Sequence, residues 1–349
     1  MHVPDGFINA PVSAVTGVVA AGAIAVSLRG ARRELDERTA PLAGLVAAFI
    51  FAVQMLNFPV AAGTSGHLLG GALAAVLVGP FTGVLCVSVV LLMQGILFAD
   101  GGLTALGVNI TDMAIVTTVV SYAFFRGLVK VLPRKRRSVT VASFVAALLS
   151  VPAAALAFTF LYAIGGTTDV AISKVATAMI GVHVLIGVGE AAITALTVGA
   201  VIAVRPDLVY GARGLQQRLK LRVNGELVDA PTAAAPVAAR SSHRKLWITG
   251  LVTSLVLAGF VSFYASASPD GLEKVAKDKG IDARTGKHAT EDSPLAGYGV
   301  KDVSDARVSG GLAGVIGVGV TVVAGTGVFW TVRRRRTSDS SPVSVPEGV

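Results

Sequence analysis

Eight long apolar stretches constrain most strongly what this 349-residue chain can fold into. A helix needs about 20 apolar residues to cross the roughly 30 Å of hydrocarbon in a bilayer. Such stretches occupy residues 10–28, 40–57, 81–98, 106–126, 139–164, 175–204, 246–265 and 309–332. Charged residues make up only 15% of the chain, whereas soluble domains contain roughly 25%. The sequence therefore predicts an all-α polytopic membrane protein.

Basic segments predict how the loops are distributed across the membrane. They occupy residues 29–38, 126–137, 205–222, 244–246 and 333–336. The positive-inside rule places all of them in the cytoplasm. If the apolar run 67–98 crossed the membrane once, the basic segment 126–137 would lie outside. We therefore expect this run, which Gly79 and Pro80 interrupt, to contain a short first segment at 67–79 that brings the chain back to the same side. We expect a seven-segment bundle, then a two-span hairpin with an external loop, in the cell (plasma) membrane. The N-terminus is then extracytoplasmic and the C-terminus cytoplasmic.

Composition sets the expected domain limits and excludes several classes of site. Residues 1–210 form the predicted bundle, and the Ala/Pro-rich stretch within 211–245 is typical of a linker. Residues 246–332 form the hairpin, and 333–349 read as a disordered tail. The net charge of +9 resides beside the apolar segments and indicates no nucleic-acid partner. With one cysteine, Cys86, the chain can form neither an internal disulfide nor a thiolate cluster.

The first two residues can chelate a metal ion. The Met1 amine, the amide of His2 and the imidazole of His2 form two fused chelate rings, and the predicted topology puts His67 on the same side of the membrane. Such a nitrogen set favours Ni(II) or Cu(II) over Zn(II), and Co(II) also accepts it. We expect Met1 to be retained, since His2 is bulky. Asn57, Thr64 and Ser65 could orient the His67 ring. Equally open is a plain reading, in which His2 belongs to a loose terminus and His67 caps a helix.

Three stretches, MHVPDGF, QMLNFPVAAGTSGHLLGG and HVLIGVGEAAITAL, resemble the CbiM/NikM family over roughly residues 1–210. These are cobalt and nickel substrate-capture (S) components of energy-coupling factor (ECF) transporters, which belong to the ABC class. The resemblance implies capture of Ni(II) or Co(II) by Met1, His2 and His67, with no cofactor beyond the transported ion. It also implies a transmembrane coupling (T) component and ABC-type ATPase subunits as partners. The stretch SPDGLEKVA, residues 268–276, is similar to a PDGLE, CbiN/NikN-type component fused through the linker.

The sequence lacks the G-x-x-x-x-G-K-[S/T] phosphate loop, so we expect a transport subunit rather than an ATPase or another enzyme. A second function class stays open. Asp112, His183 and Glu190 are ionisable residues within apolar segments, where such groups are costly and often functional. They could serve an ion-coupled secondary transporter or channel for divalent metal, or they could hold helices together or meet the coupling partner. The shared ligand set cannot distinguish nickel from cobalt.

Overall fold

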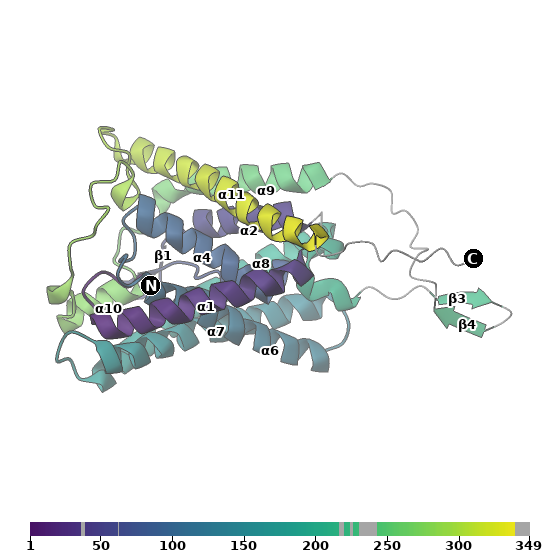
Figure 1. The fold of residues 1–349 in the computed structure, drawn as a ribbon, viewed down its shortest axis with the longest axis horizontal. Helices are drawn as coiled ribbons and strands as arrows, with labels where there is room; N and C mark the ends of the chain where they lie inside the picture. The colour runs from purple at the N-terminus through teal and green to yellow at the C-terminus, as the bar shows by residue number, and fades with distance from the viewer. Residues whose placement is uncertain (36–38, 62, 216–219, 224–225, 230–242, 339–349) are drawn as a thin grey trace, which may run out of the picture.

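The computed structural model describes residues 1–35, 39–61, 63–215, 220–223, 226–229 and 243–338. Its long helices run side by side along one axis (Figure 1). They are α1 (Ala10–Glu34), α4 (Pro80–Leu97), α7 (Arg136–Gly165), α8 (Ile172–Val204), α9 (His243–Gly259), α11 (Ala306–Ser338), and a continuous stretch made of α5 (Leu106–Asn109), the π-helix η1 (Ile110–Val116) and α6 (Thr117–Val131). Seven helical stretches are long and apolar enough to span a bilayer, and the 16-residue α2 (Thr39–Gln54) is shorter. The predicted all-α polytopic fold is confirmed.

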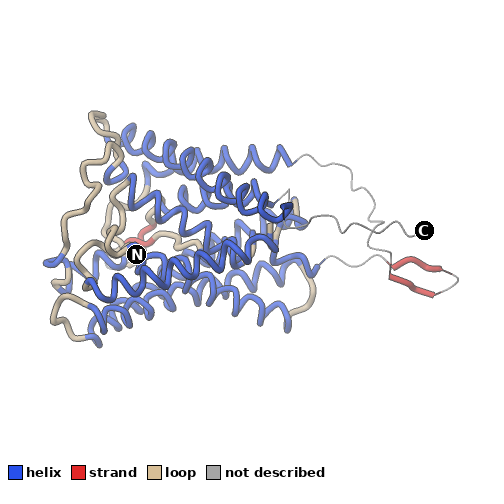
Figure 2. The backbone as a smooth tube through the Cα atoms, in the orientation of Figure 1, coloured by secondary structure: helices blue, strands red, loops and turns tan. Residues whose placement is uncertain are grey.

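The two ends of the bundle differ in composition. Most loop residues gather at the end near the N-terminus, here called the loop end (Figure 2). The opposite end, here called the basic end, holds the last turn of α1, the α6–α7 connection, the end of α8, the start of α9 and the end of α11 (Figure 1). The described parts of the five basic segments therefore lie together, which is the arrangement that the positive-inside rule requires.

A half-length helix within residues 67–98 returns the chain to the side from which it entered. Extended chain enters the bundle at His67 and continues as α3 (Gly71–Val78), which ends at Gly79 with φ 104°. Pro80 then begins α4, a position where proline costs no hydrogen bond. The Glu34 carboxylate accepts from the backbone N–H of Phe81 at 3.2 Å and of Thr82 at 2.7 Å, which satisfies the first turn of α4. The predicted short segment is thus present as α3 and the extended residues that precede it.

The loop before α3 is braced by a small antiparallel pair, β1 (Phe58–Pro59) and β2 (Ser65–Gly66). A Cβ at Gly66 would come within 2.5 Å of the Ile186 side chain, so β2 lies close against α8. The carboxylate of Glu190, also on α8, accepts from the N–H of Leu69 at 2.7 Å and of Gly70 at 3.2 Å. These contacts fix the backbone that carries His67.

The C-terminal unit packs directly on the bundle. Helices α9 and α11 lie against α2, and small residues permit the close approach: a Cβ at Gly44 of α2 would come within 2.5 Å of Thr326 Oγ1 on α11. Between α9 and α11 the chain covers the loop end, where it forms η5 (Val261–Tyr264), α10 (Gly271–Lys279), η6 (Asp282–Arg284) and η7 (Ala296–Tyr298).

Two segments differ from the expected linker and tail. The chain continues from α8 through the 3-10 turns η2 (Pro206–Leu208) and η3 (Tyr210–Leu215), and β3 (Lys220–Val223) pairs with β4 (Glu226–Asp229) inside the predicted linker. Helix α11 continues to Ser338, so helix occupies the first residues of the predicted disordered tail. The rest of these predictions, at 216–219, 224–225, 230–242 and 339–349, lies outside the described residues.

Candidate metal site

The N-terminal segment is held inside the loop end rather than trailing from it. The side chain of Asn109 accepts from the N–H of Val3 at 2.7 Å and donates to the carbonyl of Val3 at 3.1 Å. Asp5 accepts from the N–H of Thr104 at 2.8 Å, and its own carbonyl accepts from Gly286 N–H at 2.7 Å. Met1 is therefore only 3% exposed, and the plain reading of a loose terminus does not describe this structure.

The amine of Met1 meets the imidazole of His67. Met1 N lies 2.6 Å from His67 Nε2, and His67 is buried. The other ring nitrogen, His67 Nδ1, lies 3.0 Å from the carbonyl of Leu68 and can donate to it. That bond leaves Nε2 with its lone pair toward the amine, which is the tautomer that a metal ligand needs.

The His2 ring completes the cluster. It stacks on the His67 ring with centroids 5.2 Å apart. His2 Nε2 lies 3.1 Å from Gln94 Oε1, and Nδ1 lies 3.4 Å from Asp100 Oδ1. The hydroxyl of Tyr298 donates to the other oxygen of Asp100 at 2.6 Å, so the C-terminal unit supports the residues around His2. The structure thus brings together Met1, His2 and His67, which the sequence predicted to be ligands.

Asp270 also enters this cluster, and the sequence reasoning missed it. Its Oδ2 lies 2.8 Å from Met1 N and 3.6 Å from His67 Nε2. One ligand atom each from His2, His67 and Asp270 lie within 4.8 Å of one another, a spacing that could hold a metal ion. Asp270 belongs to the SPDGLE stretch of the C-terminal unit. The available signal was topological, because the predicted external loop of the hairpin faces the same compartment as His67.

Burial and charge set the protonation of these groups. Desolvation lowers the pKa of the His2 imidazole to about 4, against an opposing effect of Asp100, so the ring is neutral at pH 7. Burial by itself would raise the pKa of Asp270, but the Met1 amine and His67 outweigh it and hold that pKa well below its usual range. The site therefore presents a neutral imidazole and an ionised carboxylate, both of which are competent metal ligands.

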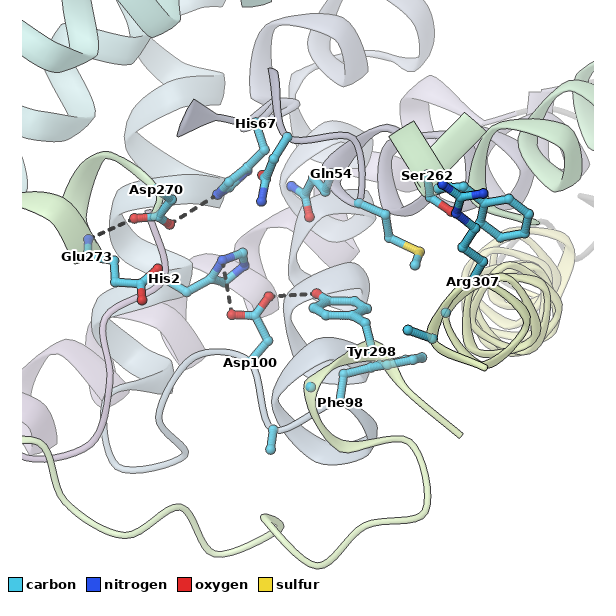
Figure 3. A pocket seen from close by; sticks show the side chains of 17 residues that line it. His2, Gln54, His67, Phe98, Asp100, Ser262, Asp270, Glu273, Tyr298 and Arg307 are labelled. Atoms are coloured by element: carbon cyan, nitrogen blue, oxygen red, sulfur yellow. Dashed lines mark hydrogen bonds and ion pairs between the residues drawn. The ribbon is translucent and has the colours of Figure 1, made fainter. Parts of the chain in front are cut away.

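A cavity of about 520 Å³ adjoins the cluster (Figure 3). His2, His67 and Asp100 of the bundle line it, and so do Asp270, Tyr298 and Arg307 of the C-terminal unit (Figure 3). The bundle and the C-terminal unit therefore both contribute to the wall of this cavity.

The side chains predicted to orient His67 make no hydrogen bond to its ring among the described residues. Ser65 Oγ donates to the carbonyl of Ser268 at 2.7 Å, and Asn57 bonds Ser266 through its backbone carbonyl. Thr64 is buried and bonds residues of its own loop through its backbone. Among the described residues it is therefore the carbonyl of Leu68, and none of these three side chains, that contacts His67 Nδ1.

The three intramembrane ionisable residues have separate surroundings. Within the described part of the chain, no hydrogen bond or ion pair joins Asp112, His183 and Glu190 to one another. Glu190 bonds the backbone before α3, and His183 Nδ1 lies 2.7 Å from the carbonyl of Met179. The carboxylate of Asp112 has no hydrogen-bond partner among the described residues.

Comparison with known proteins agrees with this architecture. Residues 2–208 match the CbiM family, described as a cobalt uptake substrate-specific transmembrane region, and residues 244–334 match the PDGLE domain. A putative metal transport protein of Haloquadratum walsbyi is 39% identical over 214 residues, covering 60% of this chain and 94% of that protein. A putative fused nickel transport protein, NikMN, of Archaeoglobus fulgidus is 36% identical over 209 residues, covering 60% of this chain and 68% of that protein.

A solved structure shares the fold. The crystal structure of a truncated transition metal transporter superposes with a TM-score of 0.52 at 26% identity, covering 58% of this chain and 99% of that one. Together these matches confirm the resemblance seen in the sequence motifs. The chain therefore belongs to the CbiM family of cobalt and nickel transport membrane proteins, and it carries a PDGLE domain in the same polypeptide.

Proposed function

We propose that this chain is the substrate-capture subunit of an ATP-driven importer, and that it takes up Ni(II) or Co(II) from the extracytoplasmic side at its loop end. The observation that carries the proposal is that the Met1 amine lies 2.6 Å from His67 Nε2, while the His2 ring stacks on the His67 ring. Three nitrogen groups from the first two residues and one distant loop converge in a buried place, beside a cavity through which an ion could arrive.

The chemistry of the donors supports a late transition metal. Nitrogen-rich, tetragonal sites suit Ni(II) and are accepted by Co(II), whereas Mg(II) and Ca(II) prefer oxygen. Gln94 Oε1 can accept a hydrogen bond from His2 Nε2, which leaves the lone pair on Nδ1, the ring nitrogen that can close a chelate ring with the backbone amide of the same residue. Since burial holds the ring neutral at pH 7, protons compete little with the metal there.

Import against a gradient then requires a motor in other chains. The sequence has no phosphate-binding loop, so we propose that a transmembrane coupling component and a pair of ABC-type ATPase subunits supply the energy. The basic end would face the cytoplasm of the cell and the loop end the outside. The alternative, an ion-coupled permease using Asp112, His183 and Glu190, receives less support because Glu190 is occupied with the backbone of Leu69 and Gly70.

The ligand set is tested by calorimetric titration of Ni(II) and Co(II) on the purified full chain. We expect His67→Ala, His2→Ala, or one residue added before Met1, each to abolish tight binding. His243→Ala at the start of α9 is the matched histidine control and should bind as the wild type does. Unchanged affinity in His67→Ala would refute the site.

The coupling is tested separately, by metal uptake into cells with and without the ATPase subunits. We expect uptake to require them. Uptake that persists undiminished in their absence would exclude the subunit function and would favour the ion-coupled permease.

A further inference from the structure

The two oxygens of Asp270 serve different parts of the structure. Asp270 is the N-cap of α10, and its Oδ1 accepts from the N–H of Glu273 at 2.8 Å. Its Oδ2 points the other way, into the metal site, 2.8 Å from Met1 N. The capping bond fixes the carboxylate plane, so Oδ2 is held in place before any ion arrives.

The distances fit a shared ion. Donors bound at about 2.1 Å from one metal lie roughly 3 Å apart when adjacent and roughly 4.2 Å apart when opposite. Asp270 Oδ2 lies 2.8 Å from Met1 N, near the spacing of adjacent donors, and 3.6 Å from His67 Nε2, between the adjacent and the opposite spacing. Both distances fall within the span of two donors on one ion, so this oxygen is close enough to bind an ion held by Met1 and His67 directly.

The segment that carries Asp270 is fastened to the bundle beside His67. The N–H of Ser65 donates to the carbonyl of Pro269 at 2.9 Å, and Ser65 Oγ donates to the carbonyl of Ser268 at 2.7 Å. The next residue, Gly271, lies so close to α8 that a Cβ there would come within 3.0 Å of His183 Cε1. The Ser-Pro-Asp-Gly stretch is thus shaped to bring one carboxylate into contact with the capture loop.

Charge balance also favours a carboxylate at this position. A divalent ion bound by an amine, two neutral imidazoles and one deprotonated amide keeps one net positive charge. Burying an uncompensated charge is costly, and the site residues Met1 and His67 are nearly fully buried. The Asp270 carboxylate cancels the remaining charge.

We propose that Asp270 is a direct ligand of the transported metal, so that the C-terminal unit supplies an oxygen donor to the nitrogen ligands of the bundle. This inference rests on the proposed function, because it takes Met1, His2 and His67 as the capture site. It gives the PDGLE unit a chemical part in binding the ion.

The test compares Asp270→Asn with Asp278→Asn in the full chain. Asparagine is as good an N-cap as aspartate, so Asp270→Asn keeps α10 capped and removes only the charge and the carboxylate. Asp278 lies on the same helix, is half exposed and pairs with Lys274, so its substitution is the matched control. Affinities come from Ni(II) and Co(II) titration, and the d–d absorption of bound Co(II) reports its donors.

We expect Asp270→Asn to bind at least about 10-fold more weakly, the lower end of the cost of losing an outer-shell partner, with a shifted Co(II) spectrum, and Asp278→Asn to match the wild type. Weaker binding with an unchanged spectrum would overturn the ligand assignment, since the carboxylate would then act through its charge alone. Wild-type affinity in Asp270→Asn, with binding abolished in His67→Ala, would overturn this inference and leave the proposed function standing. Wild-type affinity in both variants would refute both.

Discussion

Replacing Glu190 by alanine tests whether this buried carboxylate is structural or belongs to a transport relay. Glu190 is fully buried, and it accepts from the N–H of Leu69 at 2.7 Å and of Gly70 at 3.2 Å. Alanine leaves both N–H groups buried without a partner, and each costs about 1–3 kcal/mol. We therefore expect the free energy of unfolding to fall by about 2–6 kcal/mol.

The assay is thermal unfolding of the metal-free protein in detergent. At about 2 °C per kcal/mol for a chain of this size, Glu190→Ala should lower Tm by roughly 4–12 °C. Glu190→Gln keeps one acceptor oxygen and should lose about half as much. Thr194→Val, one turn further along α8, is the control: its buried hydroxyl has no hydrogen-bond partner among the described residues, so its loss should not lower Tm.

Metal affinity supplies a second readout. The backbone of Leu69 continues directly from His67, so a loosened segment should also weaken Ni(II) binding in Glu190→Ala. A Tm within about 2 °C of wild type would refute the structural role. If Glu190→Gln then also abolished uptake with its stability and metal affinity intact, Glu190 would belong to an ion-coupled pathway instead.

Two further substitutions test how the N-terminal segment is held. Asn109→Ala removes both bonds to Val3 and leaves the Val3 N–H buried without a partner, at a cost of about 1–3 kcal/mol. If metal binding has to order the N-terminal segment again, Ni(II) affinity measured by calorimetry should fall roughly 5- to 150-fold. Thr111→Ala loses only a bond within its own helix and should bind Ni(II) normally. Gly6→Ala places a Cβ at φ 90° in overlap with the Arg284 carbonyl, so amide hydrogen exchange should accelerate in both segments; unchanged protection would show that this contact does not hold them together.

The positions of the helices could be predicted because apolar length alone determines which segments can span a bilayer. Their ends could not, because a helix does not stop where its apolar pattern stops. The apolar run of α11 was expected to end at 332, yet the helix continues to Ser338 through four arginines, which are good helix formers. At residues 67–98 the break was visible, since Gly79 and Pro80 permit a turn that few other pairs allow.

Part of the site was predictable from chemistry and parity. The donor groups of Met1 and His2 are adjacent in sequence, and the count of spans put His67 in the same compartment. The orientation of the His67 ring was not predictable, because the Leu68 carbonyl, one residue away, takes the role expected of a distant side chain. Asp270 is separated from His67 by about 200 residues of chain, and no periodicity or spacing reports a contact of that range.

The shared cavity depends on how the C-terminal unit is seated on the bundle. A tether alone would raise the local concentration of the C-terminal unit, but its position is also fixed by the contact of Gly44 with Thr326 and of Gly317 with Phe51. These glycines let α11 lie directly on α2, and the loop between α9 and α11 thereby lies over the candidate metal site (Figures 1 and 3). His2 and His67 line the cavity together with Asp270, Tyr298 and Arg307 of the C-terminal unit, so both units contribute to the wall beside the candidate metal site.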